Sequence, residues 1–259
     1  MNAGARPFTW YVAPLTGMEP SRVGAAARSS AGRDRRHKVI EFVGLAGVGK
    51  SHLNRRLVAW YGSRALDLDA VAPRRLGLGA WWHALSVVVP VFAPVLAAGP
   101  APARKRWRFL RQALALAARE AWARRYLTSD VVVLSEEGWF HKLREFRRLT
   151  GSDTSFGDLA VTARARLFDA DLVILLTAEP EVVCARKLRR RGIEVTPESV
   201  ARQYAASRAL GQWDEHRKSV RDLEEAATKA TCDFQVIDYR PGFDVVAELV
   251  PLLEARGLD

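Results

Sequence analysis

Eight consecutive residues constrain the fold of this chain more than any other feature of its sequence. Gly44-Leu45-Ala46-Gly47-Val48-Gly49-Lys50-Ser51 matches the pattern G-x-x-x-x-G-K-[ST] at every defined position. The motif follows an apolar run at 38–43, which is typical of a buried strand, and leads into a stretch at 50–61 that is typical of a helix. A strand, a glycine-rich turn and a helix in this order predict a phosphate-binding loop, or P-loop.

Each residue type in this loop suits the binding of a nucleoside triphosphate. Glycines leave room for backbone N–H groups to surround a diphosphate, and the N-terminus of the following helix directs the positive end of its dipole at the same anion. Lys50 is spaced to reach the β- and γ-phosphates, and the hydroxyl of Ser51 to hold Mg²⁺. ATP and Mg²⁺ are therefore the predicted cofactors.

Short apolar runs alternate with longer helical segments along the rest of the chain. Strands are predicted at 38–43, 64–71, 130–134, 171–176 and 233–237. Helices are predicted at 50–61, 79–98, 101–127, 180–191 and 243–256. Strands that are continuously apolar and each followed by a helix indicate a parallel sheet covered on both faces, which is the α/β class.

Composition limits the class of protein further. With 49% hydrophobic residues and eight Trp, the chain is expected to be globular. Cys184 and Cys232 are too few for a disulfide framework or a cysteine-rich zinc site, and they favour a reducing, cytoplasmic location. Residues 1–37 are rich in Ala, Gly, Ser and Arg without an apolar period, which predicts a flexible basic tail before a single domain at 38–259.

The formal net charge of +11 predicts a polyanionic partner, which could be a nucleic acid, an anionic membrane or a phosphorylated small molecule. The positive charge is concentrated at 1–37, 101–125 and 186–221. No motif for sequence-specific nucleic-acid recognition accompanies these patches, so nucleic acid is not the expected partner. For the third patch, 186–221, the phosphate groups of ATP are the expected partner.

Acidic residues follow two of the predicted strands. Asp67 and Asp69 lie at the end of the second strand, and Glu136 and Glu137 follow the third. Ligands of parallel sheets collect at these carboxyl ends, so Asp67 and Asp69 are predicted to contact the acceptor substrate, and Asp69 suits either this contact or the role of a base. Either Glu can bind Mg²⁺, with Ser51, or accept the proton of an attacking hydroxyl, and the sequence leaves open which one points inward. The alternative is that the Glu pair caps the next helix.

The helix predicted at 180–191 ends in a run of arginines. Arg186, Arg190 and Arg191 are predicted to contact phosphate, because guanidinium groups stabilise the charge that builds up between phosphate donor and acceptor. The alternative is a solvated basic helix end that complements the helix dipole.

Together these segments resemble the thymidylate kinase-like branch of the P-loop nucleoside and nucleotide kinases. The resemblance rests on the P-loop, the strand end at 131–138, the strand and Arg-rich helix at 171–192, and the closing Val236-Ile237-Asp238 strand. It covers about 38–256. It implies a three-layer P-loop NTPase fold whose five-stranded parallel sheet has the order 2-3-1-4-5. It also implies an Arg-rich lid at about 186–200 and an enzyme that transfers the γ-phosphate of ATP to a small-molecule acceptor.

The chain departs from that family at the end of the third strand. The family has Asp-Arg-Tyr there, and this chain has Ser135-Glu136-Glu137-Gly138-Trp139. The family's Arg contacts the nucleotide substrate, so the resemblance extends to the fold and the ATP chemistry but not to thymidylate as acceptor.

A stretch without charge, 76–103, begins a predicted helical insertion at about 76–127. It can form a buried helix that walls the acceptor pocket, or it can dock on a membrane surface through 76–111 with help from the neighbouring basic residues. A bilayer span is disfavoured, since the stretch lies between two strands of one sheet and Pro90 and Pro94 are expected to interrupt the helix. Peripheral membrane contact and a homodimer stay open. So does the alternative function, a regulatory or assembly NTPase that acts at a membrane or on a polyanionic partner.

Overall fold

The computed structural model describes residues 37–150, 170–229, 232–240 and 242–258. The chain divides into a unit of Met1–Arg35 and a unit of Arg36–Asp259, and every element below belongs to the second unit. Apart from His37, the tail predicted at 1–37 lies outside the described residues.

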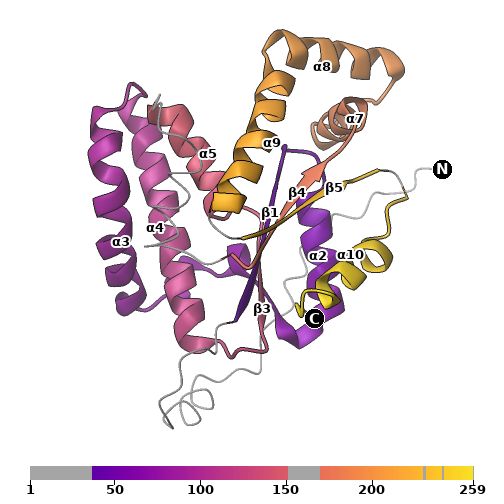
Figure 1. Cartoon of the computed structure of the whole chain (residues 1–259). Helices are drawn as coiled ribbons and strands as arrows, with labels where there is room; N and C mark the ends of the chain where they lie inside the picture. Colours follow the sequence, from indigo (N-terminus) through magenta and orange to yellow (C-terminus); the bar gives the residue numbers. More distant parts are fainter. Residues whose placement is uncertain (1–36, 151–169, 230–231, 241, 259) are drawn as a thin grey trace, which may run out of the picture. The chain divides into compact units, whose positions relative to one another are not determined.

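A five-stranded parallel sheet forms the centre of the described unit (Figure 1). Its strands are β1 (Lys38–Gly44), β2 (Ala65–Asp67), β3 (Val132–Ser135), β4 (Leu172–Thr177) and β5 (Asp233–Asp238). The order in the sheet is β2-β3-β1-β4-β5, and every neighbouring pair is parallel. The predicted α/β architecture and strand order are therefore confirmed.

Helices cover both faces of this sheet, so the fold has three layers (Figure 1). One core packs α2 (Lys50–Tyr61) and α10 (Val245–Glu254) against one face. The other face carries α3 (Leu78–Ala98), α4 (Ala103–Tyr126), α5 (Trp139–Thr150) and α9 (Gln212–Lys229). Side chains of successive strand residues point to alternate faces, which is why Phe42 belongs to the first core and Val43 to the second. Two further helices, α7 (Pro180–Arg190) and α8 (Pro197–Ala209), follow β4.

Two local predictions were wrong. The second strand was predicted over 64–71 but ends at Asp67, because the Asp67 carboxylate accepts the N–H of Asp69 and starts a 3-10 turn at Leu68–Ala70. The prolines at 90 and 94 do not interrupt α3, which is continuous. The inner side of α3 is fully buried along its length, and this tertiary packing outweighs the backbone hydrogen bonds that the prolines remove.

A cluster of aromatic rings joins α3, α4 and α5 on the second face. The Phe92 ring lies edge-on to Phe109 at 5.5 Å and to Phe146 at 4.9 Å, and it stacks on Trp139 at 6.0 Å between ring centroids. All four rings are almost fully buried. Aromatic contacts of this kind add to the free energy of burial, so the three helices are fixed to one another.

Among the described helices, none is both long enough and apolar enough to cross a membrane.

A buried carboxylate connects β1 to α5. Glu41 lies in the middle of β1, where its Oε2 accepts the N–H of Phe140 at 3.2 Å and its Oε1 accepts the N–H of His141 at 3.1 Å. Gly138 leaves the space for this contact, because a Cβ atom at position 138 would collide with the Glu41 carboxylate. Burial raises the pKa of Glu41 to about 8, although the two N–H groups act in the opposite direction.

This raised pKa predicts that stability depends on pH through Glu41. Between the ordinary value of 4.5 and about 8, the folded protein binds more protons than the unfolded chain, so stability is lost as pH rises through this window. At these pH values Glu41 contributes a slope of at most about 1.4 kcal/mol per pH unit to the free energy of unfolding, and we expect Glu41→Gln to remove this contribution. Urea unfolding of both proteins from pH 5 to pH 8 measures it. Equal slopes in the two proteins would contradict the role given to Glu41.

Candidate functional site

The P-loop connects β1 to α2 in a conformation that needs its glycines. Gly44 and Gly49 have φ angles of 151° and 123°, which residues with a Cβ rarely adopt. A Cβ at Gly44 would lie 2.6 Å from the Leu176 carbonyl oxygen, and one at Gly49 would lie 2.9 Å from Cε1 of Tyr239. The loop backbone is therefore held closely against residues at the ends of β4 and β5.

Lys50 lies over this loop. Its Nζ donates to the carbonyl oxygens of Gly44 at 3.0 Å and Leu45 at 3.4 Å. Burial and the nearby charge of Arg144 lower the pKa of Lys50. The loop therefore presents a largely desolvated ammonium group, which interacts strongly with an anion.

Hydrogen bonds connect the P-loop to the end of β2 through Glu136. The Ser51 hydroxyl donates to Glu136 Oε2 at 2.6 Å, and Asn54 Nδ2 donates to Oε1 at 3.3 Å. The backbone N–H of Glu136 in turn donates to Asp69 Oδ2 at 2.7 Å. Of the two glutamates, Glu136 is thus the one that lies against the P-loop.

The oxygen ligands around Ser51 fit a magnesium ion. Hydroxyl and carboxylate oxygens are the ligands that Mg²⁺ prefers, and it usually takes only one or two from the protein and the rest from phosphate and water. In the described part of the chain no group of three or more His, Cys, Asp and Glu residues could hold a metal alone. A metal beside Ser51 and Glu136 would therefore need the phosphates of a bound nucleotide.

The Arg-rich helix α7 lies near the loop. Arg186 donates from Nη1 to the carbonyl of Val48, and its guanidinium lies 4.7 Å from the centre of the Tyr239 ring. Arg190 is exposed, and its charge also lowers the pKa of Lys50. Arg191 is the exposed C-cap residue of α7. The predicted lid at 186–200 contains the end of α7, the connection after it and the first turn of α8.

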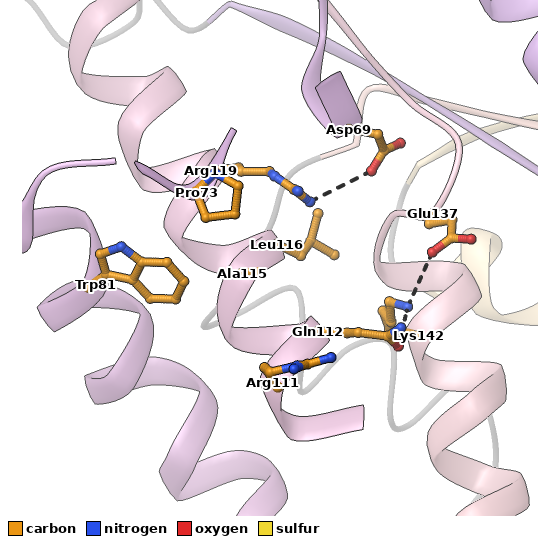
Figure 2. Close-up of a pocket in the computed structure, with 10 residues that line it drawn as sticks. All are labelled: Asp69, Pro73, Trp81, Arg111, Gln112, Ala115, Leu116, Arg119, Glu137 and Lys142. Atoms are coloured by element: carbon orange, nitrogen blue, oxygen red, sulfur yellow. Dashed lines mark hydrogen bonds and ion pairs between the residues drawn. The ribbon is translucent and has the colours of Figure 1, made fainter. Parts of the chain in front are cut away.

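A pocket of about 470 Å³ opens beside Asp69 (Figure 2). It is lined by Asp69, Pro73, Trp81, Arg111, Gln112, Ala115, Leu116, Arg119, Glu137 and Lys142. The carboxylates are paired, since Arg119 Nη1 lies 4.0 Å from Asp69 Oδ1 and Lys142 Nζ lies 3.6 Å from Glu137 Oε2. Burial raises the pKa of Asp69.

The predicted site residues fall into three groups in this geometry. Lys50, Ser51 and Glu136 lie at the P-loop, with Arg186 on the loop backbone. Asp69 and Glu137 line the pocket. Asp67 instead holds the 3-10 turn that positions Asp69.

Sequence reasoning missed most of the pocket wall. It offered 76–103, where Trp81 lies, as a wall of the acceptor pocket and predicted a basic patch at 101–125, but it gave no site role to Arg111, Gln112, Arg119 and Lys142. The spacing of the lining residues on α4 could have indicated this wall. These residues are three or four positions apart, so they share one face of the helix: 111, 115 and 119, and also 112 and 116.

Comparison with known proteins adds a distant structural likeness. No protein-family model matches the chain, and no curated protein matches its sequence. Among solved structures, a deoxyadenosine kinase from M. mycoides with bound dCTP is similar over 85% of this chain and 98% of its own, with 15% sequence identity and a TM-score of 0.38. A likeness at that level assigns no activity or substrate. What the described residues show directly is a P-loop between β1 and α2 of a 2-3-1-4-5 parallel sheet, as predicted for a three-layer P-loop NTPase fold.

Proposed function

We propose that the protein transfers the γ-phosphate of ATP to a small-molecule acceptor bound in the pocket beside Asp69. The observation that carries this proposal is the unbroken path from Ser51 through Glu136 to Asp69. The P-loop lies on one side of the carboxylates of Glu136 and Asp69, and the pocket beside Asp69 lies on the other. A regulatory NTPase has no need of a second small-molecule pocket in this place.

The chain's own groups can perform the steps of such a transfer. Backbone N–H groups of the loop and the N-terminus of α2 bind the phosphates, and Lys50 turns from its carbonyl partners to the γ-phosphate. Mg²⁺ supplies charge neutralisation on the phosphate oxygens when it is bound. The raised pKa of Asp69 makes its carboxylate a stronger base than an ordinary aspartate. It accepts the proton of the acceptor hydroxyl as the new O–P bond forms and the bond to ADP breaks. Arg186 and Arg190 stabilise the charge on the transferred group.

A screen of a metabolite extract tests the proposal. The full chain is incubated with ATP, Mg²⁺ and the extract, and mass spectrometry identifies products that gain one phosphate. A product made by the wild type and absent with Lys50→Ala is the expected result. If ATP is hydrolysed only on addition of vesicles and no product forms, the regulatory NTPase is the correct function instead.

We also propose that the outer face of the hairpin α3–α4 contacts a membrane surface peripherally. Leu78 and Trp82 of α3 are 82% and 71% exposed, and Trp107 of α4 is 65% exposed. The stretch 76–103 has no charge, while Arg104 and Lys105 beside it are exposed. Exposed Trp next to basic residues suits the interface of an anionic bilayer.

Flotation with vesicles checks this contact. We expect binding to vesicles that contain phosphatidylserine and weaker binding to pure phosphatidylcholine. The double variant Trp82→Ser/Trp107→Ser should bind at least about tenfold more weakly, because each buried aromatic ring contributes about 1.5–3 kcal/mol. Leu210→Ser, an equally exposed apolar site on another part of the unit, serves as the control. Absence of wild-type flotation would refute the contact.

A further inference from the structure

The pocket beside Asp69 has a second cavity next to it. This second cavity has about 220 Å³ and is lined by Arg108, Gln112, Glu137, His141, Lys142, Arg144, Glu145 and Arg148. Gln112, Glu137 and Lys142 line both cavities, and Lys142 Nζ donates to Gln112 Oε1 at 3.1 Å. The two cavities therefore adjoin at the hydrogen bond that connects α4 to α5.

Basic side chains outnumber carboxylates in this combined site by six to three. Each carboxylate already has a cation, since Asp69 faces Arg119 and the buried Lys142 pairs with both Glu137 and Glu145. Arg108 and Arg111, in contrast, have no carboxylate within ion-pair distance among the residues that the structure describes. Among the described residues, Arg108 and Arg111 thus carry positive charge that no carboxylate balances.

The two unbalanced arginines lie away from the point of transfer. Figure 2 draws Arg111 well apart from Asp69 and on the same helix as Gln112, which accepts the hydrogen bond from Lys142. Arg108 is three residues before Arg111 on α4, so both side chains project from the same side of the helix. Both side chains are exposed, Arg111 on the wall of the first pocket and Arg108 on the wall of the second cavity.

His141 also lines the second cavity. Its Nδ1 atom is buried within the protein and has no hydrogen-bond partner among the described residues. Burial and the charges of Arg144, Lys142 and Lys50 lower the pKa of His141 to about 3, so the imidazole is neutral and can donate one hydrogen bond. A neutral imidazole adds no positive charge to the cavity wall, so the cationic side chains there are the arginines and Lys142.

We propose that the acceptor carries an oxyanion, a phosphate or carboxylate group, at the end remote from the hydroxyl that is phosphorylated, and that Arg108 and Arg111 bind this group beside His141. The inference rests on the proposed phosphotransferase function and names the class of its acceptor. Guanidinium groups bind phosphate and carboxylate through two parallel hydrogen bonds, so a neutral analogue of the same size leaves both arginines without a partner.

Matched sets of acceptors test this assignment. Each set contains a neutral polyol or sugar, its phosphate ester and its acid, for example glycerol, glycerol 3-phosphate and glycerate, or ribose, ribose 5-phosphate and ribonate. Transfer from ATP is followed by ADP release and by product mass. The expected result is transfer to the charged members of a set, and the ratio between phosphate and acid identifies which oxyanion is bound.

Two variants locate the site. Arg108→Gln and Arg111→Gln should each lower kcat/KM for the charged acceptor by about tenfold to a hundredfold, with KM for ATP unchanged. Arg125→Gln, an exposed arginine on the same helix and outside both lining sets, is the matched control and should behave as wild type. Equal rates with neutral and charged members, together with wild-type kinetics in the two variants, would overturn the proposal and leave the phosphotransferase function standing.

Binding tests the oxyanion site even if no member of a set reacts. With a non-hydrolysable ATP analogue and Mg²⁺ saturating the P-loop, glycerol 3-phosphate and ribose 5-phosphate should raise the Tm of the wild type and not that of the double variant Arg108→Gln/Arg111→Gln. Equal shifts in both proteins, or no shift in either, would overturn the oxyanion site. A failure of the ATP analogue itself to raise Tm would instead contradict the proposed function.

Discussion

Replacing Lys50 by Ala should lower kcat of the phosphotransfer by about a hundredfold to a thousandfold. The ammonium group lies over the loop within hydrogen-bond distance of two loop carbonyls, largely shielded from water, and no other described lysine has this position. Catalysis of phosphoryl transfer consists mainly of positioning and charge stabilisation, and one preorganised donor accounts for about a hundredfold to a thousandfold. Single-turnover product formation with saturating ATP measures the effect on the chemical step.

Stability separates this effect from damage to the fold. Burial and neighbouring positive charges lower the pKa of Lys50, which means that the folded state disfavours the charged ammonium group. The substitution Lys50→Ala should therefore leave Tm unchanged or raise it. Lys218→Ala, an exposed lysine on α9, is the control for the loss of a positive charge. Wild-type turnover in Lys50→Ala would show that the P-loop takes no part in the reaction.

Glu136→Gln and Glu137→Gln should differ sharply, although the residues are neighbours. Glu136 accepts the Ser51 hydroxyl, so its loss should lower kcat about a hundredfold and raise the Mg²⁺ concentration needed for half-maximal rate by about tenfold or more. Glu137 faces the pocket and Lys142, so its loss should raise KM for the acceptor about tenfold and leave the Mg²⁺ dependence unchanged. Rates measured against Mg²⁺ and against acceptor separate the two.

The opposite pattern would contradict this division of roles. If Glu137→Gln changes the Mg²⁺ dependence and Glu136→Gln does not, then the metal binds on the pocket side. Asn54→Ala provides a further comparison, since it removes only the second hydrogen bond to Glu136 and should have a smaller effect than Glu136→Gln.

The fold could be predicted because its evidence is local. The P-loop spacing fixes a strand and a helix on either side of one turn, and the apolar runs at 130–134 and 171–176 are long enough to be strands buried on both faces. Once these positions are known, the resemblance to nucleotide kinases supplies the strand order, which the structure confirms.

The site was only partly predictable, for physical reasons. The alternation of side chains along a strand stops at Ser135, so it does not tell whether Glu136 or Glu137 faces the loop. Glu41 contacts residues 99 and 100 positions later in the chain, a distance over which no local pattern operates. The walls of the pocket come from α3, α4 and α5, whose faces are set by how the helices pack and not by their composition.

The contact between Glu41 and α5 has a consequence for one wall of the proposed acceptor pocket. The same strand begins the P-loop at Gly44 and holds the N-terminus of α5 at Glu41, three residues earlier. Three residues of extended strand span about 10 Å, and this length cannot stretch or shorten as side chains change. The backbone of β1 therefore fixes where α5 begins relative to the P-loop. Under the proposed function, acceptor preference can diverge through substitutions on α4 while this part of the site keeps its place.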